Sequence, residues 1–298
     1  MELEQNRQRN VIQYLADTYE NAKEYGSILD VRKLDLEFLE QRLDEVKNSV
    51  ARDLLEVPYR DMILEKLPVI ILQANIMGKK YDVVCTNPPY MGRQGMNPKL
   101  VNYVDKTFAD SKKDLFAVFI ERCIESSFQN GFVSMLTQHS WMFLSSFEKL
   151  RAKIINNISI DSMNHLGPRA FEEIGGEVVQ STAFVLRNHF IQSFIGTYVR
   201  LVDYKSSDIK ELEFKNRLNK YNATKKSFDK LPGFPIAYWL KENLLNAFEF
   251  NKTVSNYFEV RNGITTGENE RFIMRGQRLP KTIFLNSNLM KNILIVSF

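Results

Sequence analysis

The amino-acid sequence predicts an α/β fold, in which crossover helices connect the strands of a parallel sheet, followed by the start of a second, basic domain. Short apolar segments alternate with longer segments of helical periodicity between residues 81 and 188. The chain has 298 residues, of which 44% are hydrophobic, enough for a sizeable core. Residues 205–298 contain 16 Lys and Arg against 9 Asp and Glu, whereas residues 1–204 contain 24 against 27. This basic part fits a polyanion-binding segment and, equally well, a solvated Lys-rich surface.

The first 80 residues are expected to form a helical lead-in to the sheet. One helix is predicted over residues 11–25 and a second over residues 36–55, where leucines and valines recur at spacings of three and four. A third apolar segment, residues 62–77, contains Pro68. Because proline lacks the backbone N–H, we expect a helix to end or kink there.

The elements of the sheet follow in order. A short apolar strand is predicted over residues 81–86, and then a helix in "DLFAVFIERCIESSFQNG", with Gly131 placed to stop it. Further strands are predicted from Phe132 and from Ile158, with the helix "SSFEKLRAKIINN" between them. From Gly176 a longer strand is predicted, as an antiparallel partner at the end of the sheet.

The sequence also argues against several classes of protein. It has no run of about 18 apolar residues and no basic, apolar leader at its start, so neither a membrane span nor a signal peptide is indicated and a cytoplasmic protein is expected. Cys85 and Cys123 are too few for a disulfide framework. No cysteine and histidine spacing is typical of a metal site.

The residues that follow the predicted strand 81–86 carry the chemistry. Ligands of an open α/β sheet bind beyond the carboxyl ends of its strands, which is where Asn87 begins. Pro88 and Pro89 fix φ and remove two backbone donors, which leaves a stiff loop with free carbonyl acceptors. Asn87 adds a side-chain acceptor and Tyr90 an aromatic face, as an exocyclic amino group on a planar heterocycle requires. The alternative interpretation is a proline-rich turn with a capping asparagine.

This tetrapeptide, NPPY, resembles motif IV of the amino-group DNA methyltransferases, which methylate N6 of adenine or N4 of cytosine with S-adenosylmethionine. The wider sequence resembles one branch, the PglX adenine-specific methyltransferases of BREX phage-defence systems. The similar blocks occur in family order from about residue 20 to residue 273. They are "ENAKEYGSIL", "YDVVCTNPPYMGRQGMN", "KKDLFAVFIER", "QHSWMFLSSFEKLR", "HLGPRAFEEIGGEVVQSTAFVL" and "VRNGITTGENERF".

The resemblance implies a Rossmann-like methyltransferase sheet and roles for matching residues. The Asn87 side-chain oxygen and the Pro88 carbonyl would accept the two N6 hydrogens of a flipped adenine, aiming the nitrogen lone pair at the methyl sulfonium. Pro89 completes the motif, and Tyr90 would stack on the base, a contact worth roughly 1–3 kcal/mol. Phe171 falls where related enzymes place a second aromatic ring, although an ordinary core phenylalanine is the alternative. No covalent intermediate is needed, because the sulfonium leaving group is already activated.

Four further residues are implied as candidates for binding the cofactor. Lys112 and Asp114 resemble the block that borders the adenine and cofactor pocket, although Asp114 fits a helix cap equally well. Ile28 and Asp30 lie where the family approaches the adenine ring of S-adenosylmethionine. Double-stranded DNA is the implied partner, together with other defence-system proteins or a chain that supplies the rest of the cofactor site.

The sequence departs from the family in two places. The Gly-rich motif I that holds the methionine part of the cofactor is expected before NPPY, but residues 1–80 contain only Gly26 and Gly78. The tail after residue 273 does not resemble the family, which suggests a frameshift or a premature end. The isolated chain is therefore expected to be inactive unless another chain supplies motif I. The alternatives are a non-catalytic DNA-binding remnant and, from the tetrapeptide alone, a protein-glutamine methyltransferase.

Four regions are predicted. Residues 1–80 form the helical lead-in with part of the cofactor half, and residues 81–204 form the methyltransferase core with NPPY. Residues 205–235, rich in lysine, form a basic linker. Residues 236–298 form the start of a target-recognition region.

Overall fold

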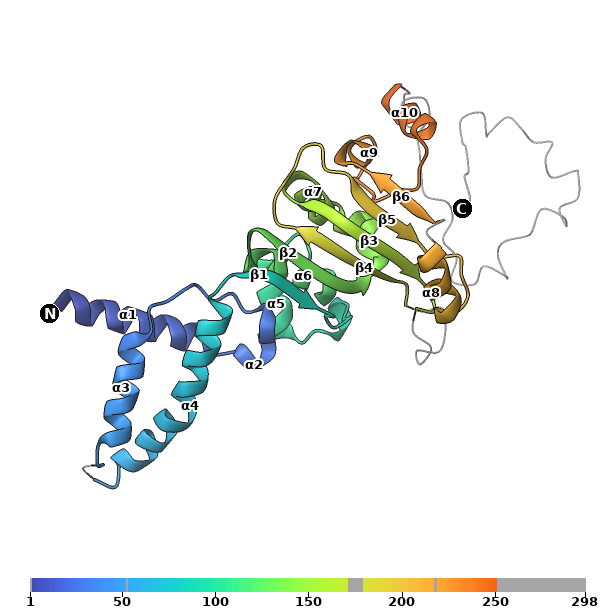
Figure 1. Ribbon diagram of the computed structural model, residues 1–298. Coiled ribbons are helices and arrows are strands. Elements are labelled where there is room, and N and C mark those ends of the chain that lie inside the picture. Colours follow the sequence, from blue (N-terminus) through green and yellow to red (C-terminus); the bar gives the residue numbers. More distant parts are fainter. Residues whose placement is uncertain (1, 52, 171–178, 217–218, 251–298) are drawn as a thin grey trace, which may run out of the picture. The chain divides into compact units, whose positions relative to one another are not determined.

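The structure is a computed structural model that describes residues 2–51, 53–170, 179–216 and 219–250 (Figure 1). The chain divides into two compact units, residues 1–241 and 242–298. Helix α10 (Glu242–Phe250) is the described part of the second unit. No helix among the described residues is long and apolar enough to cross a membrane.

A six-stranded sheet is the centre of the first unit. Its order is β1-β2-β4-β3-β5-β6. The α/β class predicted from the sequence is confirmed. The strands are β1 (Tyr81–Thr86), β2 (Ser127–Gln138), β3 (Ser159–Gly167), β4 (Ser181–Arg187), β5 (Gly196–Arg200) and β6 (Lys220–Ala223).

The sheet is mixed rather than wholly parallel. Strands β1, β2, β3 and β5 run in one direction, whereas β4 runs antiparallel to both of its neighbours, β2 and β3. The antiparallel direction predicted for β4 is confirmed, but its predicted place at the end of the sheet is wrong. Strand β4 begins at the edge where β3 ends, so without a crossover back to the far edge it has to run antiparallel.

One face of this sheet carries the main core. Helices α6 (Leu115–Ser126) and α7 (Glu148–Asn157) lie on the same face (Figure 1). Their apolar side chains meet alternate residues of the strands, as the pleat of a strand requires. The buried contacts include Ile120, Leu150, Val133, Met135, Met163, Phe184 and Leu186.

The lead-in is helical, as predicted, and has its own apolar cluster. Leu15, Leu39, Ile71 and Ala74 are buried together there. The other helices of the first unit are α1 (Glu2–Tyr19), α2 (Ala22–Tyr25), α3 (Glu37–Asn48), α4 (Glu56–Met77), α5 (Pro98–Thr107), α8 (Ser207–Asn216) and α9 (Lys225–Asp229).

Several predicted helix boundaries are wrong. The helix predicted over residues 11–25 is α1, which begins at Glu2 and ends at Tyr19, and the helix predicted over residues 36–55 is α3, which ends at Asn48. Helix α4 continues through Pro68, because a proline removes one backbone hydrogen bond while Ile71 and Ala74 still pack in the cluster beyond it. Helix α6 ends at Ser126 rather than at Gly131, and Gly131 lies inside β2. A Cβ on Gly131 would lie 2.9 Å from the Asp82 carbonyl oxygen, so this glycine permits a close strand contact.

The predicted linker, residues 205–235, is instead part of the first unit. It contains α8, β6 and α9, and β6 pairs with β5 through four residue pairs. Apolar side chains within this polar segment, such as Phe228 and Leu231, are buried. Most of its lysines lie on exposed faces of packed elements, whereas Lys210 is buried and donates to the Leu166 and Leu201 carbonyls.

Candidate functional site

The NPPY tetrapeptide lies at the edge of the sheet formed by the carboxyl ends of β1, β2, β3 and β5. Asn87 follows the last residue of β1, and the register places Gln138 of β2 beside Ser181 and Ser181 beside Gly167 of β3. We call this the carboxyl edge. It is the edge at which the sequence predicts the site.

Asp114 braces the loop that follows the motif. It is the N-cap of α6, where its carboxylate accepts hydrogen bonds from the Phe116 N–H at 3.3 Å and from the Met91 N–H at 3.0 Å. The Leu115 N–H in turn donates to the Met91 carbonyl at 3.0 Å. Burial raises the pKa of Asp114, while the backbone donors oppose this shift. The capping interpretation of Asp114 is thus confirmed, and the cap also ties the loop to the core.

Tyr90 is half-buried with its hydroxyl fixed. The hydroxyl donates to the Leu136 carbonyl at 3.3 Å, and the ring meets Phe116 edge to face at a centroid distance of 6.1 Å. Burial raises the pKa of Tyr90, partly opposed by the hydroxyl of Ser181. The phenol is therefore neutral at pH 7, and the core holds the ring in one orientation.

The rest of the motif alternates between buried and exposed residues. Pro88 is buried, whereas Asn87 and Pro89 are exposed. The Asn87 side chain forms no hydrogen bond with any residue in the described part of the chain. Its amide is therefore available to a ligand at the carboxyl edge.

Lys112 belongs to an ion-pair network beside the same loop. Its Nζ lies 3.4 Å from Asp105 Oδ1, and Arg93 donates to the same carboxylate at 2.7 Å and 2.5 Å. The hydrogen bond from Arg93, with that from Lys112, lowers the pKa of Asp105 to about 2. This network connects the loop after NPPY to α5.

The other predicted residues lie elsewhere. Ile28 is buried in an apolar cluster with Met96 and Leu100, so its side chain faces protein rather than an open site. Asp30 is exposed and lies 3.6 Å from Arg122 near the C-terminal end of α6, at the opposite edge of the sheet from Asn87. Phe171 lies outside the described residues.

The structure reveals a histidine pair at the carboxyl edge that the sequence analysis missed. His139 Nδ1 lies 2.7 Å from His165 Nε2, and His165 Nδ1 lies 3.2 Å from the Tyr238 hydroxyl. Burial lowers the pKa of both histidines, that of His165 to about 3, so the pair is neutral at pH 7. The signal in the sequence was the position of His139 directly after a strand.

A buried arginine fastens the segment that contains Tyr238. Arg151 donates to the carbonyls of Gly233 at 2.8 Å, Trp141 at 2.9 Å and Leu144 at 2.6 Å. Its donors are satisfied by carbonyl groups of two loops, which therefore pack as one layer at the carboxyl edge.

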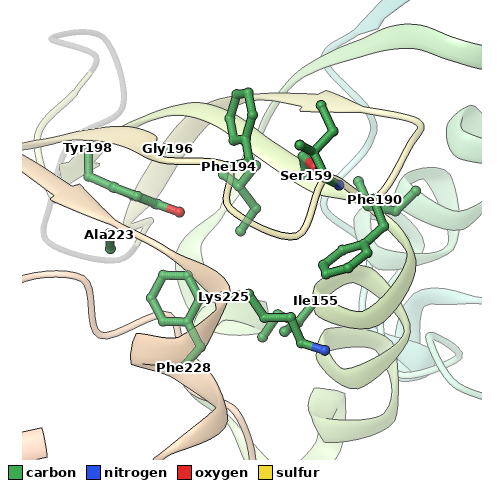
Figure 2. A pocket seen from close by; sticks show the side chains of 12 residues that line it. Ile155, Ser159, Phe190, Phe194, Gly196, Tyr198, Ala223, Lys225 and Phe228 are labelled. Carbon is green, nitrogen blue, oxygen red and sulfur yellow. The ribbon is translucent and has the colours of Figure 1, made fainter.

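A small cavity lies at the other edge of the sheet. Figure 2 shows Phe190, Phe194, Phe228 and Tyr198 around it, and Lys225 near its rim. Its volume is about 30 Å³, room for about one water molecule, so it is not a ligand site. Among the described residues, no group of three or more His, Cys, Asp or Glu is placed to hold a metal ion.

Comparison with known proteins identifies the family. The model of the Eco57I restriction-modification methylase family matches residues 8–171, more than half of the chain. An adenine-specific methyltransferase PglX of Lacticaseibacillus casei (strain Zhang) is 43% identical over 211 residues, 68% of this chain and 18% of that protein. The adenine-specific methyltransferase BrxX of Escherichia coli O9:H4 (strain HS) is 38% identical over 231 residues, 77% of this chain and 19% of that protein.

Solved structures resemble the chain more distantly. A type I restriction-modification methyltransferase subunit from Streptococcus thermophilus superimposes with a TM-score of 0.40 at 15% identity, over 53% of this chain and 37% of that one. The chain spans less than a fifth of the length of the two curated relatives. By its match over residues 8–171 and its identity to PglX and BrxX, the chain belongs to the Eco57I restriction-modification methylase family.

Proposed function

We propose that the chain is the base-binding part of an adenine-specific DNA methyltransferase that uses S-adenosylmethionine in phage defence or restriction-modification. Its partners would be double-stranded DNA and other proteins of the same defence system. The names of the two relatives support the reaction class. The observation that carries the proposal is the exposed Asn87 amide at the carboxyl edge, which no described residue bonds, beside a Tyr90 ring that the core holds in place.

The chemistry assigned to these residues is recognition of an amino group. A target adenine has to leave the duplex, at a cost of a few kcal/mol of unstacking. The Asn87 side-chain oxygen and the Pro88 carbonyl would accept the two N6 hydrogens, and the exposed part of the Tyr90 ring would stack on the base. Asp114 would act indirectly, by holding the loop through Met91.

The residues that the structure describes do not make a complete cofactor site. S-adenosylmethionine supplies the methyl group, and its methionine part is held by a Gly-rich turn after a strand. Among the described residues no strand precedes β1, and neither Gly26 nor Gly78 follows a strand. We therefore propose that another polypeptide segment supplies this turn.

The free edge of β1 is the proposed site at which that segment joins the sheet. Within the described part of the chain, β1 pairs with β2 alone. Val83 is 61% exposed and Tyr81 is 39% exposed, so this strand offers both unpaired backbone groups and an apolar surface.

The proposal is tested by identifying the methylated base. The chain is coexpressed with the N-terminal part of the Lacticaseibacillus casei PglX protein, and the nucleosides of an incubated duplex are analysed by mass spectrometry. We expect N6-methyladenine with the wild-type chain and none with Asn87→Ala. Duplex binding by the variant should change by less than about twofold, because Asn87 is proposed to contact only the flipped base. N4-methylcytosine, or N6-methyladenine formed by Asn87→Ala, would contradict the assignment.

A further inference from the structure

A cationic hollow lies at the amino edge of the sheet, far from NPPY. Its volume is about 870 Å³. It opens where α4 ends, β1 begins and α6 passes into β2, and the loop after Ile28 forms one wall. The residues that line the cationic hollow and are used below are Asp30, Arg32, Lys33, Lys79, Lys80, Arg122, Glu125 and Phe128.

Arg122 is the buried anchor of the cationic hollow. Its side chain is 9% exposed. One terminal nitrogen lies 3.6 Å from Asp30 Oδ1 and the other donates to the Met77 carbonyl at 3.2 Å, while Nε has no hydrogen-bond partner within the described part of the chain. The Nε atom itself is buried, but the two terminal nitrogens carry four N–H donors for these two contacts, so the guanidinium has unused donor capacity beside the hollow.

Four more cations face the same space. Lys33, Lys79 and Lys80 are exposed, and no carboxylate in the described ranges lies within ion-pair distance of them. Arg32 is held by Tyr14, with its guanidinium 4.0 Å from the ring centroid. These side chains come from two segments that are far apart in the sequence.

The acidic residues do not neutralise this charge. Asp30 and Glu125 also line the cationic hollow, so five cations face two carboxylates. Burial raises the pKa of Glu125, although Lys153 and Arg122 oppose the shift. The net field of the hollow is therefore positive and favours an anion.

The backbone around the cationic hollow is closely packed. A Cβ on Gly78 would lie 2.9 Å from both the Ala74 and the Arg32 carbonyl oxygens. The end of α4 and the loop that carries Arg32 and Lys33 therefore approach each other without a side chain between them. This contact brings Lys79 and Lys80 to the same hollow as Arg32 and Lys33.

We propose that the cationic hollow binds the phosphate groups of a nucleotide or of a nucleic-acid strand. Its volume lies within the range of small-molecule sites, and Phe128, a residue that is 48% exposed, offers a stacking surface for a base. The six residues of β1 separate the cationic hollow from NPPY by about 20 Å, so the hollow is a second site and not part of the NPPY site.

The test is calorimetric titration of the complete chain, without S-adenosylmethionine, using adenosine triphosphate, inorganic pyrophosphate and adenosine as probes. We expect the two phosphate compounds to bind and adenosine not to bind. The double variant Lys79→Gln/Lys80→Gln should weaken binding of the phosphate compounds by about tenfold or more. Neither lysine has an ion-pair partner among the described residues, so both charges are free to contact a phosphate group. The charge-matched control Lys23→Gln/Lys47→Gln, in α2 and α3, should leave the affinity unchanged.

A second titration separates the two sources of phosphate. If the ligand is a nucleic-acid strand, the plot of the logarithm of the duplex binding constant against the logarithm of salt concentration should become less steep by about two in Lys79→Gln/Lys80→Gln. Each phosphate contact contributes about 0.9 to this slope. If it is a free nucleotide, that slope is unchanged while triphosphate binding is lost. Equal behaviour of the double variant and its control with every probe would overturn the proposal. Asn87→Ala should not affect these titrations, so this site and the proposed function fail independently.

Discussion

Tyr90 combines contacts to the core with the stacking role that we propose for it. Its hydroxyl is bonded to the Leu136 carbonyl and its ring is supported by Phe116, so the ring is oriented before any base arrives. Such preorganisation lowers the entropy cost of binding. The proposed stacking role depends on the ring face, whereas the hydroxyl only fixes its orientation.

Substitutions of Tyr90 separate these two contributions. Tyr90→Ala should weaken binding of a duplex with an unpaired target adenine by about 1–3 kcal/mol, because the stacking surface is lost. Tyr90→Phe should have a mild effect, because the ring remains. The measurement is fluorescence anisotropy with a labelled duplex. A loss in Tyr90→Phe as large as that in Tyr90→Ala would show that the hydroxyl contacts the ligand and that the stacking assignment is wrong.

His165 makes stability depend on pH. Its folded-state pKa, about 3, lies below the value of about 6.5 expected in the unfolded chain. Between these values the unfolded chain binds a proton that the folded chain does not, so stability is present above about pH 6.5 and falls as pH decreases, by up to about 1.4 kcal/mol per unit.

Urea unfolding at pH 7, 6 and 5 tests this dependence. In His165→Gln the decline in the free energy of unfolding on acidification should be shallower than in the wild-type chain, whatever the stability of the variant at pH 7. Parallel pH profiles for the two proteins would show that His165 binds a proton as readily in the folded state as in the unfolded state, contrary to its burial beside His139 and Tyr238.

At the scale of the element, α6 joins the loop to the core. Its N-cap Asp114 fastens Met91 as well as Phe116, so one carboxylate fixes both the helix start and the path of the chain after Tyr90. Asp114→Ala should lower the free energy of unfolding by about 1–2 kcal/mol, whereas Asp114→Asn, which keeps the capping oxygen, should lower it by less.

Urea unfolding of these two variants gives the comparison, with anisotropy of the adenine-containing duplex as a second measurement. We expect Asp114→Ala also to weaken capture of an unpaired adenine, since the loop loses its brace. Wild-type stability in Asp114→Ala would be inconsistent with the observed cap.

Local patterns predicted most elements but not the limits of all of them. The apolar run of β1 and the polar residue after it gave its bounds correctly, because a short strand followed by Asn-Pro-Pro can hardly continue. The predictions at Pro68 and Gly131 were wrong for the same reason. Each residue normally ends a helix, but packing against distant residues keeps Pro68 inside α4 and places Gly131 inside β2. Propensity is a weak prior where tertiary contacts compensate.

At the scale of the whole molecule, pairing between distant strands was the part that the sequence did not predict. The position of β4 between β2 and β3, and the addition of β6 to β5, depend on contacts between segments far apart in the chain. The position of NPPY at the end of β1 was predictable because the strand and the tetrapeptide are contiguous in the sequence. The histidine pair and the cationic hollow were not, since each gathers residues from several segments.

The central claim is that this chain carries the base-binding residues and not a complete cofactor site. Calorimetric titration with S-adenosylmethionine tests it directly, with and without duplex DNA. We expect no binding heat for the chain alone in either case, and binding once the N-terminal part of the PglX relative is added. Micromolar binding to the chain alone would contradict this claim, because it would mean that residues in this chain form the cofactor site without a second polypeptide.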